Sequence, residues 1–261
     1  MKLLAFDTST EVMSIAVCRS DGAQVRQWLH TGAGGAQASG GLIAGVMDLL
    51  AQAGLELGQL DAICFGAGPG SFTGLRTACS VAQGFAFGAG VPVLPVDTLL
   101  AVAEEARGAR RSDVANIANV ANVVALRITA LLDARMDEMY VASYDYLDGQ
   151  WSIVAPIHLV RPEAFQAPGA GAGAQLLAGN VWAAYGERLL PGIPAGLQHL
   201  SALPTAAAML RLAPALLAAG KAVRAEHALP AYIRDKVAKT TAERMAEKAA
   251  LAAAVPRVTA Q

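Results

Sequence analysis

The hydrophobic and polar positions of this chain fall into two recurring patterns. Short apolar runs bounded by turn-forming residues predict strands, and apolar residues three or four positions apart predict helices. In the first hundred residues the predicted order is strand, strand, strand, helix, strand, helix, strand, helix. The strands are expected over residues 2–9, 12–18, 23–31, 60–68 and 91–98, and the helices over residues 39–53, 72–88 and 99–106. This order predicts an α/β fold, in which a mixed sheet carries helices on its faces.

The same style of pattern resumes after Gly108. It predicts a strand over residues 122–134, a hairpin over 139–160 that turns at Asp148-Gly149, and then a strand and a helix over 175–189. We therefore expect two lobes of related topology. The first covers residues 1–105 and the second residues 106–239, a helix near 205–220 packs on either lobe, and residues 240–261 form a tail. Three regularly spaced asparagines, Asn116, Asn119 and Asn122, mark an insertion that is either a helix or a linker.

Composition and charge narrow the class of protein. Hydrophobic residues make up 54% of the chain and charged residues 16%, so a folded core is expected rather than general disorder. Lys and Arg number 20 against 21 Asp and Glu, which is not the basic excess of an autonomous nucleic-acid-binding domain. Prolines and an arginine interrupt the most apolar windows, which argues against a membrane span. Three cysteines without a C-x-x-C pair favour a reduced, cytoplasmic location.

The stretch "GAGPGSFTGLR", residues 66–76, places a glycine-rich loop at the start of a predicted helix. It is not a P-loop, because no Lys-Ser or Lys-Thr follows the glycines, and it also departs from the dinucleotide fingerprint. One interpretation is a nest of backbone N–H groups that holds an anion, with Gly68, Gly70 and Ser71 as the nucleotide-binding residues. The other is that the glycines only permit tight turning and close packing, since Pro69 removes a donor.

A second candidate for phosphate chemistry is "DTST", residues 7–10, at the end of the first predicted strand. Asp7, Thr8 and Thr10 would position a metal-bound phosphate between two hairpin strands. The alternative is an Asx-turn, in which Asp7 only stabilises its own backbone. The motif by itself does not decide between the two.

Residues 133–140, "DARMDEMY", carry acids between two strands of the second predicted lobe. Asp133, Asp137 and Glu138 would suit acid–base work, but the alternative is a simple turn in which Arg135 bridges the acids. The four histidines, His30, His158, His199 and His227, are too far apart in sequence to form a ligand pair. We therefore expect no catalytic residue and no metal site in this chain.

Two apolar helix stripes complete the candidate residues. They either belong to the core or serve a neighbouring protein. As a partner interface they would comprise Leu42, Val46, Leu49, Leu50, Phe72, Leu75, Arg76 and Cys79.

Several of these segments together resemble the TsaB (YeaZ) family of tRNA threonylcarbamoyladenosine biosynthesis proteins. The resemblance rests on "LAFDTSTEVMSIAV", "GAGPGSFTGLR", "AQGFAFGAGVPVLPVDTL", "LLDARMDEMYVASY" and "EHALPAYIRDKVA", which span nearly the whole chain. It implies a two-lobed actin/Hsp70/sugar-kinase-like (ASKHA) fold. It also implies that the paired helices of the first lobe form a dimer face, and that Ser9 stands where nucleotide-binding relatives often keep glycine.

The resemblance further implies a subunit that does no chemistry alone. Such a subunit pairs with a catalytic paralogue, TsaD, and the ATPase TsaE joins the pair; a homodimer is an alternative when the chain is alone. The assembly transfers a threonylcarbamoyl group from threonylcarbamoyl-AMP to N6 of adenosine 37 in tRNAs that read ANN codons. On this basis we expect no intrinsic cofactor, with ATP, Mg²⁺ and the metal on the partner subunits and tRNA bound through the complex. The alternatives are an ATP-dependent kinase or ATPase of the same fold and, with less support, a metallopeptidase.

Overall fold

The computed structural model describes residues 1–22, 24–115, 125–169 and 173–234. The chain divides into two compact units, Met1–Ala231 and Tyr232–Gln261. None of the helices in the described ranges has the length and apolarity needed to cross a membrane. The Asn116–Asn122 insertion and the tail over 240–261 lie outside the described residues.

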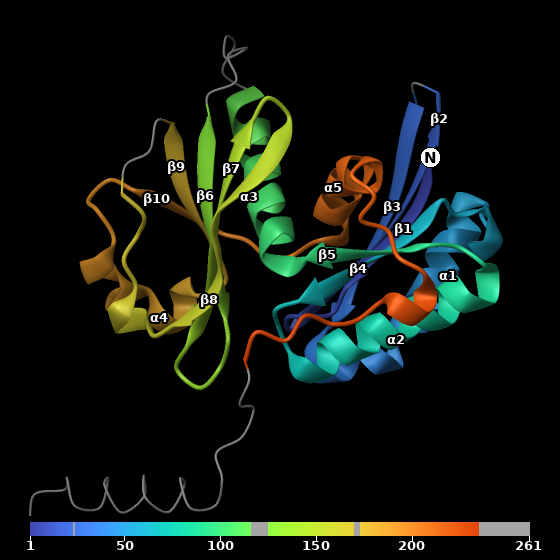
Figure 1. The fold of residues 1–261 in the computed structure, drawn as a ribbon, viewed down its shortest axis with the longest axis horizontal. Helices are drawn as coiled ribbons and strands as arrows, with labels where there is room; N and C mark the ends of the chain where they lie inside the picture. The colour runs from blue at the N-terminus through green and yellow to red at the C-terminus, as the bar shows by residue number, and fades with distance from the viewer. Residues whose placement is uncertain (23, 116–124, 170–172, 235–261) are drawn as a thin grey trace, which may run out of the picture. The chain divides into compact units, whose positions relative to one another are not determined.

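The first sheet has the strand order β3-β2-β1-β4-β5 (Figure 1). Neighbouring pairs β1–β2 and β2–β3 are antiparallel, whereas β1–β4 and β4–β5 are parallel. Central β1 is buried on both faces, as its continuous apolar run requires, whereas β3 lies at the edge and is largely exposed. The strands are β1 (Lys2–Asp7), β2 (Val12–Asp21), β3 (Gln24–Ala33), β4 (Ala62–Gly68) and β5 (Val93–Asp97).

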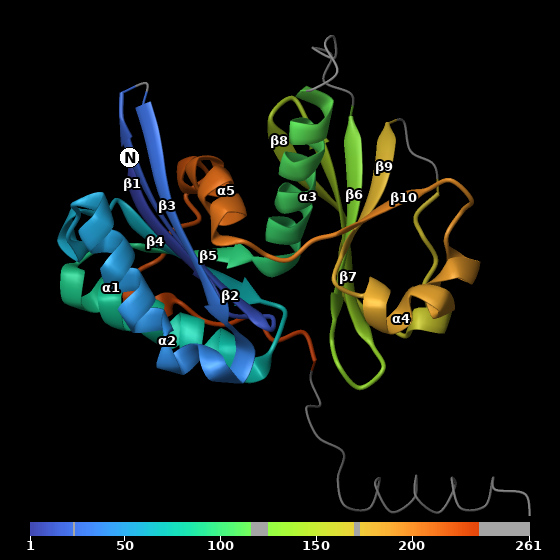
Figure 2. The same ribbon diagram turned by 180° about the vertical axis from the view of Figure 1, so that it is seen from behind.

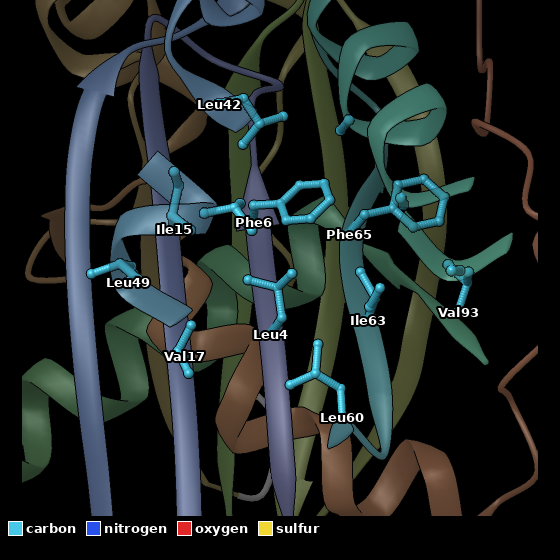
Figure 3. Packing of buried hydrophobic residues seen from close by; sticks show 14 of the residues in the cluster. Leu4, Phe6, Ile15, Val17, Leu42, Leu49, Leu60, Ile63, Phe65 and Val93 are labelled. Carbon is cyan, nitrogen blue, oxygen red and sulfur yellow. The ribbon is translucent and has the colours of Figure 1, made fainter. Parts of the chain in front are cut away.

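Helices cover both faces of this sheet. On one face, α1 (Leu42–Ala53) and α2 (Phe72–Ala89) pack on side chains such as Phe6, Ile15 and Phe65 (Figure 3). On the other, α5 (Ala206–Ala218) buries Met209 and Leu212 against a second cluster of strand residues. The helix predicted near 205–220 therefore packs on the first sheet.

The second sheet repeats the arrangement with the order β10-β9-β6-β7-β8. Central β6 has an antiparallel hairpin on one side and parallel strands on the other, as β1 does in the first sheet. The elements are β6 (Leu126–Asp133), β7 (Met139–Leu147), β8 (Gln150–Val160), β9 (Ala174–Gly179), α4 (Trp182–Leu189) and β10 (Gln198–Ser201). Two related α/β halves confirm the predicted fold class. We call the first sheet with α1, α2 and α5 the first lobe, and the second sheet with α4 the second lobe.

Helix α3 (Thr98–Ala115) connects the lobes and runs between α5 and β6 (Figures 1 and 2). The apolar spacing predicted a helix over 99–106 only, so residue 105 lies inside α3. The helix predicted over 39–53 begins with a separate 3-10 turn, η1 (Gly35–Gly40), and α1 starts only at Leu42. Strand β10 was not predicted, because its four residues are too few to show a period.

A strap, residues 221–231, returns to the first lobe after α5. Val223 forms two backbone hydrogen bonds with Val93 of β5, and the Ala231 N–H donates to the Ala67 carbonyl at 2.7 Å. The Gln83 side-chain amide of α2 donates a hydrogen bond to the Ala228 carbonyl of the strap at 2.9 Å. The first lobe is therefore completed by residues 221–231.

Candidate functional site

The two phosphate-type motifs meet at one edge of the first sheet. Strands β1 and β4 are parallel neighbours, so the segments at their carboxyl ends lie side by side. We call Asp7–Thr10, at the end of β1, the first turn, and Gly66–Ser71, at the end of β4, the glycine loop. All six residues predicted to bind a nucleotide lie in these two segments. They are Asp7, Thr8, Thr10, Gly68, Gly70 and Ser71.

Asp7 is completely buried at the end of β1. Its Oδ1 accepts hydrogen bonds from the Ser9 backbone N–H at 2.8 Å and from the Ser9 hydroxyl at 2.7 Å, which is the expected Asx-turn. Its Oδ2 is buried without a hydrogen-bond partner among the described residues. Burial raises the pKa of Asp7 to about 6, and the two bonds from Ser9 only partly oppose this. Gly66 is required beside it, because a Cβ there would lie 1.8 Å from Oδ2.

The first turn and the glycine loop are in direct backbone contact. The Ser71 N–H donates to the Ser9 carbonyl at 2.7 Å, and a Cβ on Gly70 would lie 2.5 Å from the Ser9 Cβ. The Gly68 N–H donates to the Thr98 hydroxyl at 3.1 Å. The chain's own atoms therefore occupy the Gly68 and Ser71 amides that a phosphate nest would use.

The hydroxyl groups nearby are also engaged within the chain. The Thr8 hydroxyl donates to the Gly74 carbonyl at 2.7 Å, and the Thr10 hydroxyl to the Val12 carbonyl at 3.2 Å. Ser71 is the N-cap of α2 and accepts from the Gly74 N–H at 3.4 Å. These contacts make a packed junction between β1 and α2 rather than an open cradle.

The interface residues predicted from helical spacing are mostly core residues. Phe72 and Arg76 are exposed, and the Arg76 guanidinium carbon lies 3.9 Å from the Phe72 ring centroid. The remaining six are buried and do not form a surface: Leu42, Val46, Leu49, Leu50, Leu75 and Cys79. Their period marks the inward stripe of each helix, so the prediction that these six form an interface was wrong.

Other apolar side chains of α1 and α2 point outward. Ile43 is 52% exposed, Met47 48%, and Phe87 81%. They were not predicted from the sequence, because Ile43 and Met47 are four positions apart, like the inward row beside them, and the spacing does not show which row faces outward. With Phe72, they form the outward set of the helix layer.

The acidic turn after β6 is held by ion pairs. Asp133 Oδ1 accepts from the Arg135 N–H at 2.8 Å and from the Tyr185 hydroxyl at 2.9 Å, and Arg135 also pairs with Asp133 Oδ2 at 3.2 Å. Arg188 of α4, which the sequence did not single out, pairs with Asp137 and Glu163. The turn with paired acids agrees with the second interpretation, but the arginine that bridges two of the acids is Arg188, whereas Arg135 pairs with Asp133. Within the described ranges, no three His, Cys, Asp or Glu side chains are grouped to hold a metal ion.

These observations define a class of protein. It is a two-lobed α/β protein of the ASKHA type in which the first turn and the glycine loop are hydrogen-bonded to each other. A sequence model of the family described as TsaD, tRNA N6-adenosine threonylcarbamoyltransferase, matches residues 39–259. The tRNA threonylcarbamoyladenosine biosynthesis protein TsaB of Escherichia coli is 33% identical over 247 residues, covering 91% of this chain and 96% of the relative. The chain belongs to the TsaB (YeaZ) family.

Two further comparisons agree with this assignment. The structure of YeaZ from Pseudomonas aeruginosa has a TM-score of 0.73 and 36% identity, with 88% of this chain and 99% of the other covered. A tRNA N6-adenosine threonylcarbamoyltransferase of Bordetella petrii is 30% identical over 112 residues, or 38% of this chain and 32% of the relative. The chain therefore resembles the E. coli TsaB protein and the P. aeruginosa YeaZ structure over nearly its full length, and the B. petrii transferase over a part only.

Proposed function

We propose that this chain is a non-catalytic subunit of the complex that makes threonylcarbamoyladenosine in tRNA. In this proposal the complex transfers the threonylcarbamoyl group from threonylcarbamoyl-AMP to N6 of adenosine 37 in tRNAs that read ANN codons. Family membership supports the pathway. The observation that supports the non-catalytic role is the contact of Ser71 and Gly70 with Ser9, because the Ser71 N–H that a phosphate nest would use already donates to the Ser9 carbonyl.

The proposed partner is the catalytic paralogue TsaD, docked on the outward set of α1 and α2. Ile43, Met47, Phe72 and Phe87 offer apolar surface there, and exposed aromatic and Met side chains are typical of interface cores. TsaE would join this pair, and tRNA, ATP with Mg²⁺ and the catalytic metal would be bound through the partner subunits. In the absence of the paralogue, the same face would serve a homodimer.

The test is reconstitution with purified TsaD and TsaE from the same organism. We expect a stable one-to-one complex with TsaD on size exclusion, and transfer of labelled threonylcarbamoyl to tRNA only when all proteins are present. Omitting this chain should abolish transfer under otherwise identical conditions. Transfer by this chain alone would overturn the proposal.

A kinase or ATPase of the same fold is the second candidate. It is favoured by one observation, the unpartnered Oδ2 of buried Asp7 at a strand end where such enzymes place a metal-binding carboxylate. Calorimetric titration with Mg-ATP separates the two, because binding that is lost in Asp7→Asn would support the enzyme. The absence of heat up to millimolar nucleotide would remove it.

A further inference from the structure

A buried carboxylate joins three elements between the lobes. Glu104 of α3 is 2% exposed. Its carboxylate oxygens accept hydrogen bonds from Arg107 Nε and Nη2 at 2.8 and 2.7 Å. They also accept one from Arg211 Nε of α5 at 2.8 Å. A further hydrogen bond comes from Trp151 Nε1 of β8 at 3.1 Å. One side chain on the connecting helix is thus bonded to an element of each lobe.

The charge on Glu104 is retained despite its burial. Burial on its own would raise the pKa of this carboxyl, but the hydrogen bonds and positive charges of Arg107 and Arg211 outweigh it and hold the pKa below its ordinary value. An ionised and paired carboxylate in the interior is costly to separate from its partners, since each lost bond leaves a buried charge uncompensated.

Aromatic side chains of the second lobe extend this contact. The Trp151 ring packs 5.0 Å from that of Tyr146, measured between centroids, and the Arg107 guanidinium carbon lies 4.4 Å from the Tyr146 centroid. The Tyr144 hydroxyl donates to Asp97 Oδ2, at the end of β5, at 2.6 Å. Asp97 Oδ1 meanwhile accepts from the Leu99 N–H at the start of α3. A second hydrogen-bonded bridge therefore lies beside the first.

We propose that Glu104, Arg107, Arg211, Trp151 and Tyr144 form a latch that holds the two lobes in one fixed arrangement. If the lobes opened about α3, Trp151 of the second lobe and Arg211 of the first would move apart. The carboxylate of Glu104 would then lose a hydrogen bond to at least one of them. In proteins that close around a ligand, a few loop or element-terminal residues instead absorb the change in backbone angles at the hinge. The latch makes this chain a rigid body, and it does so whether or not the proposed function is correct.

The test measures the separation of the lobes directly. Spin labels are attached at Gln52→Cys in α1 and Glu187→Cys in α4, two exposed helix positions, while native Cys18, Cys64 and Cys79 are buried and protected from the label. Double electron–electron resonance then gives the distance distribution between the lobes. Glu104→Gln removes the shared charge. The matched control is Glu163→Gln, which removes an exposed carboxylate paired with Arg188 inside the second lobe.

We expect one narrow distribution for the labelled parent and for the Glu163→Gln control, and a broader one shifted to longer distances for Glu104→Gln. A broad distribution in the parent, or an unchanged one in Glu104→Gln, would overturn the latch. If Glu104→Gln does not fold, as judged by circular dichroism, the double variant Trp151→Phe/Tyr144→Phe replaces it. That variant removes one donor from each bridge while it keeps an aromatic ring at both positions, and the same two outcomes apply.

Discussion

At the residue scale, Asp7 links the sequence motif to a measurable property. The folded chain raises its pKa from 3.8 to about 6 by burial, so the folded state binds this proton more tightly than the unfolded state. The stability that this group contributes is complete below about pH 4 and is lost as the pH rises through about 6. At about 1.4 kcal/mol per pKa unit, the loss approaches ~3 kcal/mol.

The variant Asp7→Asn should therefore lose this part of the pH dependence of the free energy of unfolding. We expect the free energy of unfolding of the variant, relative to the parent, to rise by ~3 kcal/mol between about pH 4 and about pH 8. Urea unfolding at a series of pH values measures it. Asp145→Asn is the control of opposite sign, because a hydrogen bond from Arg127 lowers the pKa of Asp145. Parallel curves for the parent and Asp7→Asn would show that folding does not raise the pKa of Asp7.

Two glycines of α2 provide a paired test of the junction. A Cβ on Gly74 would lie 1.9 Å from the Thr8 carbonyl oxygen, whereas one on Gly84 meets nothing within 4 Å. Gly74→Ala should lower the free energy of unfolding by about 1–3 kcal/mol through overpacking, and Gly84→Ala should raise it by about 0.5–1 kcal/mol through helix propensity. Denaturant unfolding of both variants gives the two signs. A gain for Gly74→Ala would mean that α2 does not start against the first turn.

The sequence could predict that both motifs are candidates for phosphate chemistry, but not how they meet. The parallel pairing of β1 and β4, which the order of elements along the chain does not specify, brings Asp7 and Gly68 to one edge. Whether a phosphate fits there depends on the Ser71–Ser9 hydrogen bond of 2.7 Å. That bond follows from backbone packing over the whole junction, and no residue type in the motif specifies it.

At the element scale, α1 and α2 show what helical periodicity measures. Leu42, Val46 and Leu49 repeat because one stripe must fill the core, and all three are buried. A binding face needs no period, since a few exposed side chains such as Met47 and Phe87 are sufficient for it. The pattern therefore predicted the helices and their buried side, but six of the residues that it offered as an interface are buried.

The outward set yields a prediction for the proposed complex. Met47→Glu combined with Phe87→Glu should weaken binding to TsaD at least about tenfold, the factor that corresponds to a loss of about 1.4 kcal/mol. The melting temperature should stay near that of the parent, since both side chains are exposed. Calorimetry with purified TsaD measures the affinity. Ile153→Glu on β8, which is 68% exposed in the second lobe, should bind like the parent, and an equal loss there would indicate a non-specific effect of charge.

At the scale of the whole molecule, local patterns predicted two related sheets but not how the chain ties them together. The glycine-rich loop, the hairpins and the order of strands are all local signals. Glu104 and Arg211, in contrast, are separated by 107 positions, and neither lies in a motif. The return of α5 and the strap to the first lobe is likewise a long-range contact, which one sequence without a fold does not reveal.

The contacts of the strap lead us to expect that the stability of the first lobe depends on residues 221–231. The Val93 N–H donates to the Val223 carbonyl at 2.9 Å, and Val223 returns a bond of 2.8 Å. A chain that ends after Gly220 loses both and leaves the outer edge of β5 open to water, so the Val93 amide should exchange with deuterium at least about tenfold faster, for a loss of about 1.4 kcal/mol. A chain that ends after Arg234 keeps every strap contact and should protect Val93 as the full chain does. Equal protection of Val93 in the shorter chain would show that β5 is stable without the strap, and the dependence of the first lobe on residues 221–231 would then be wrong.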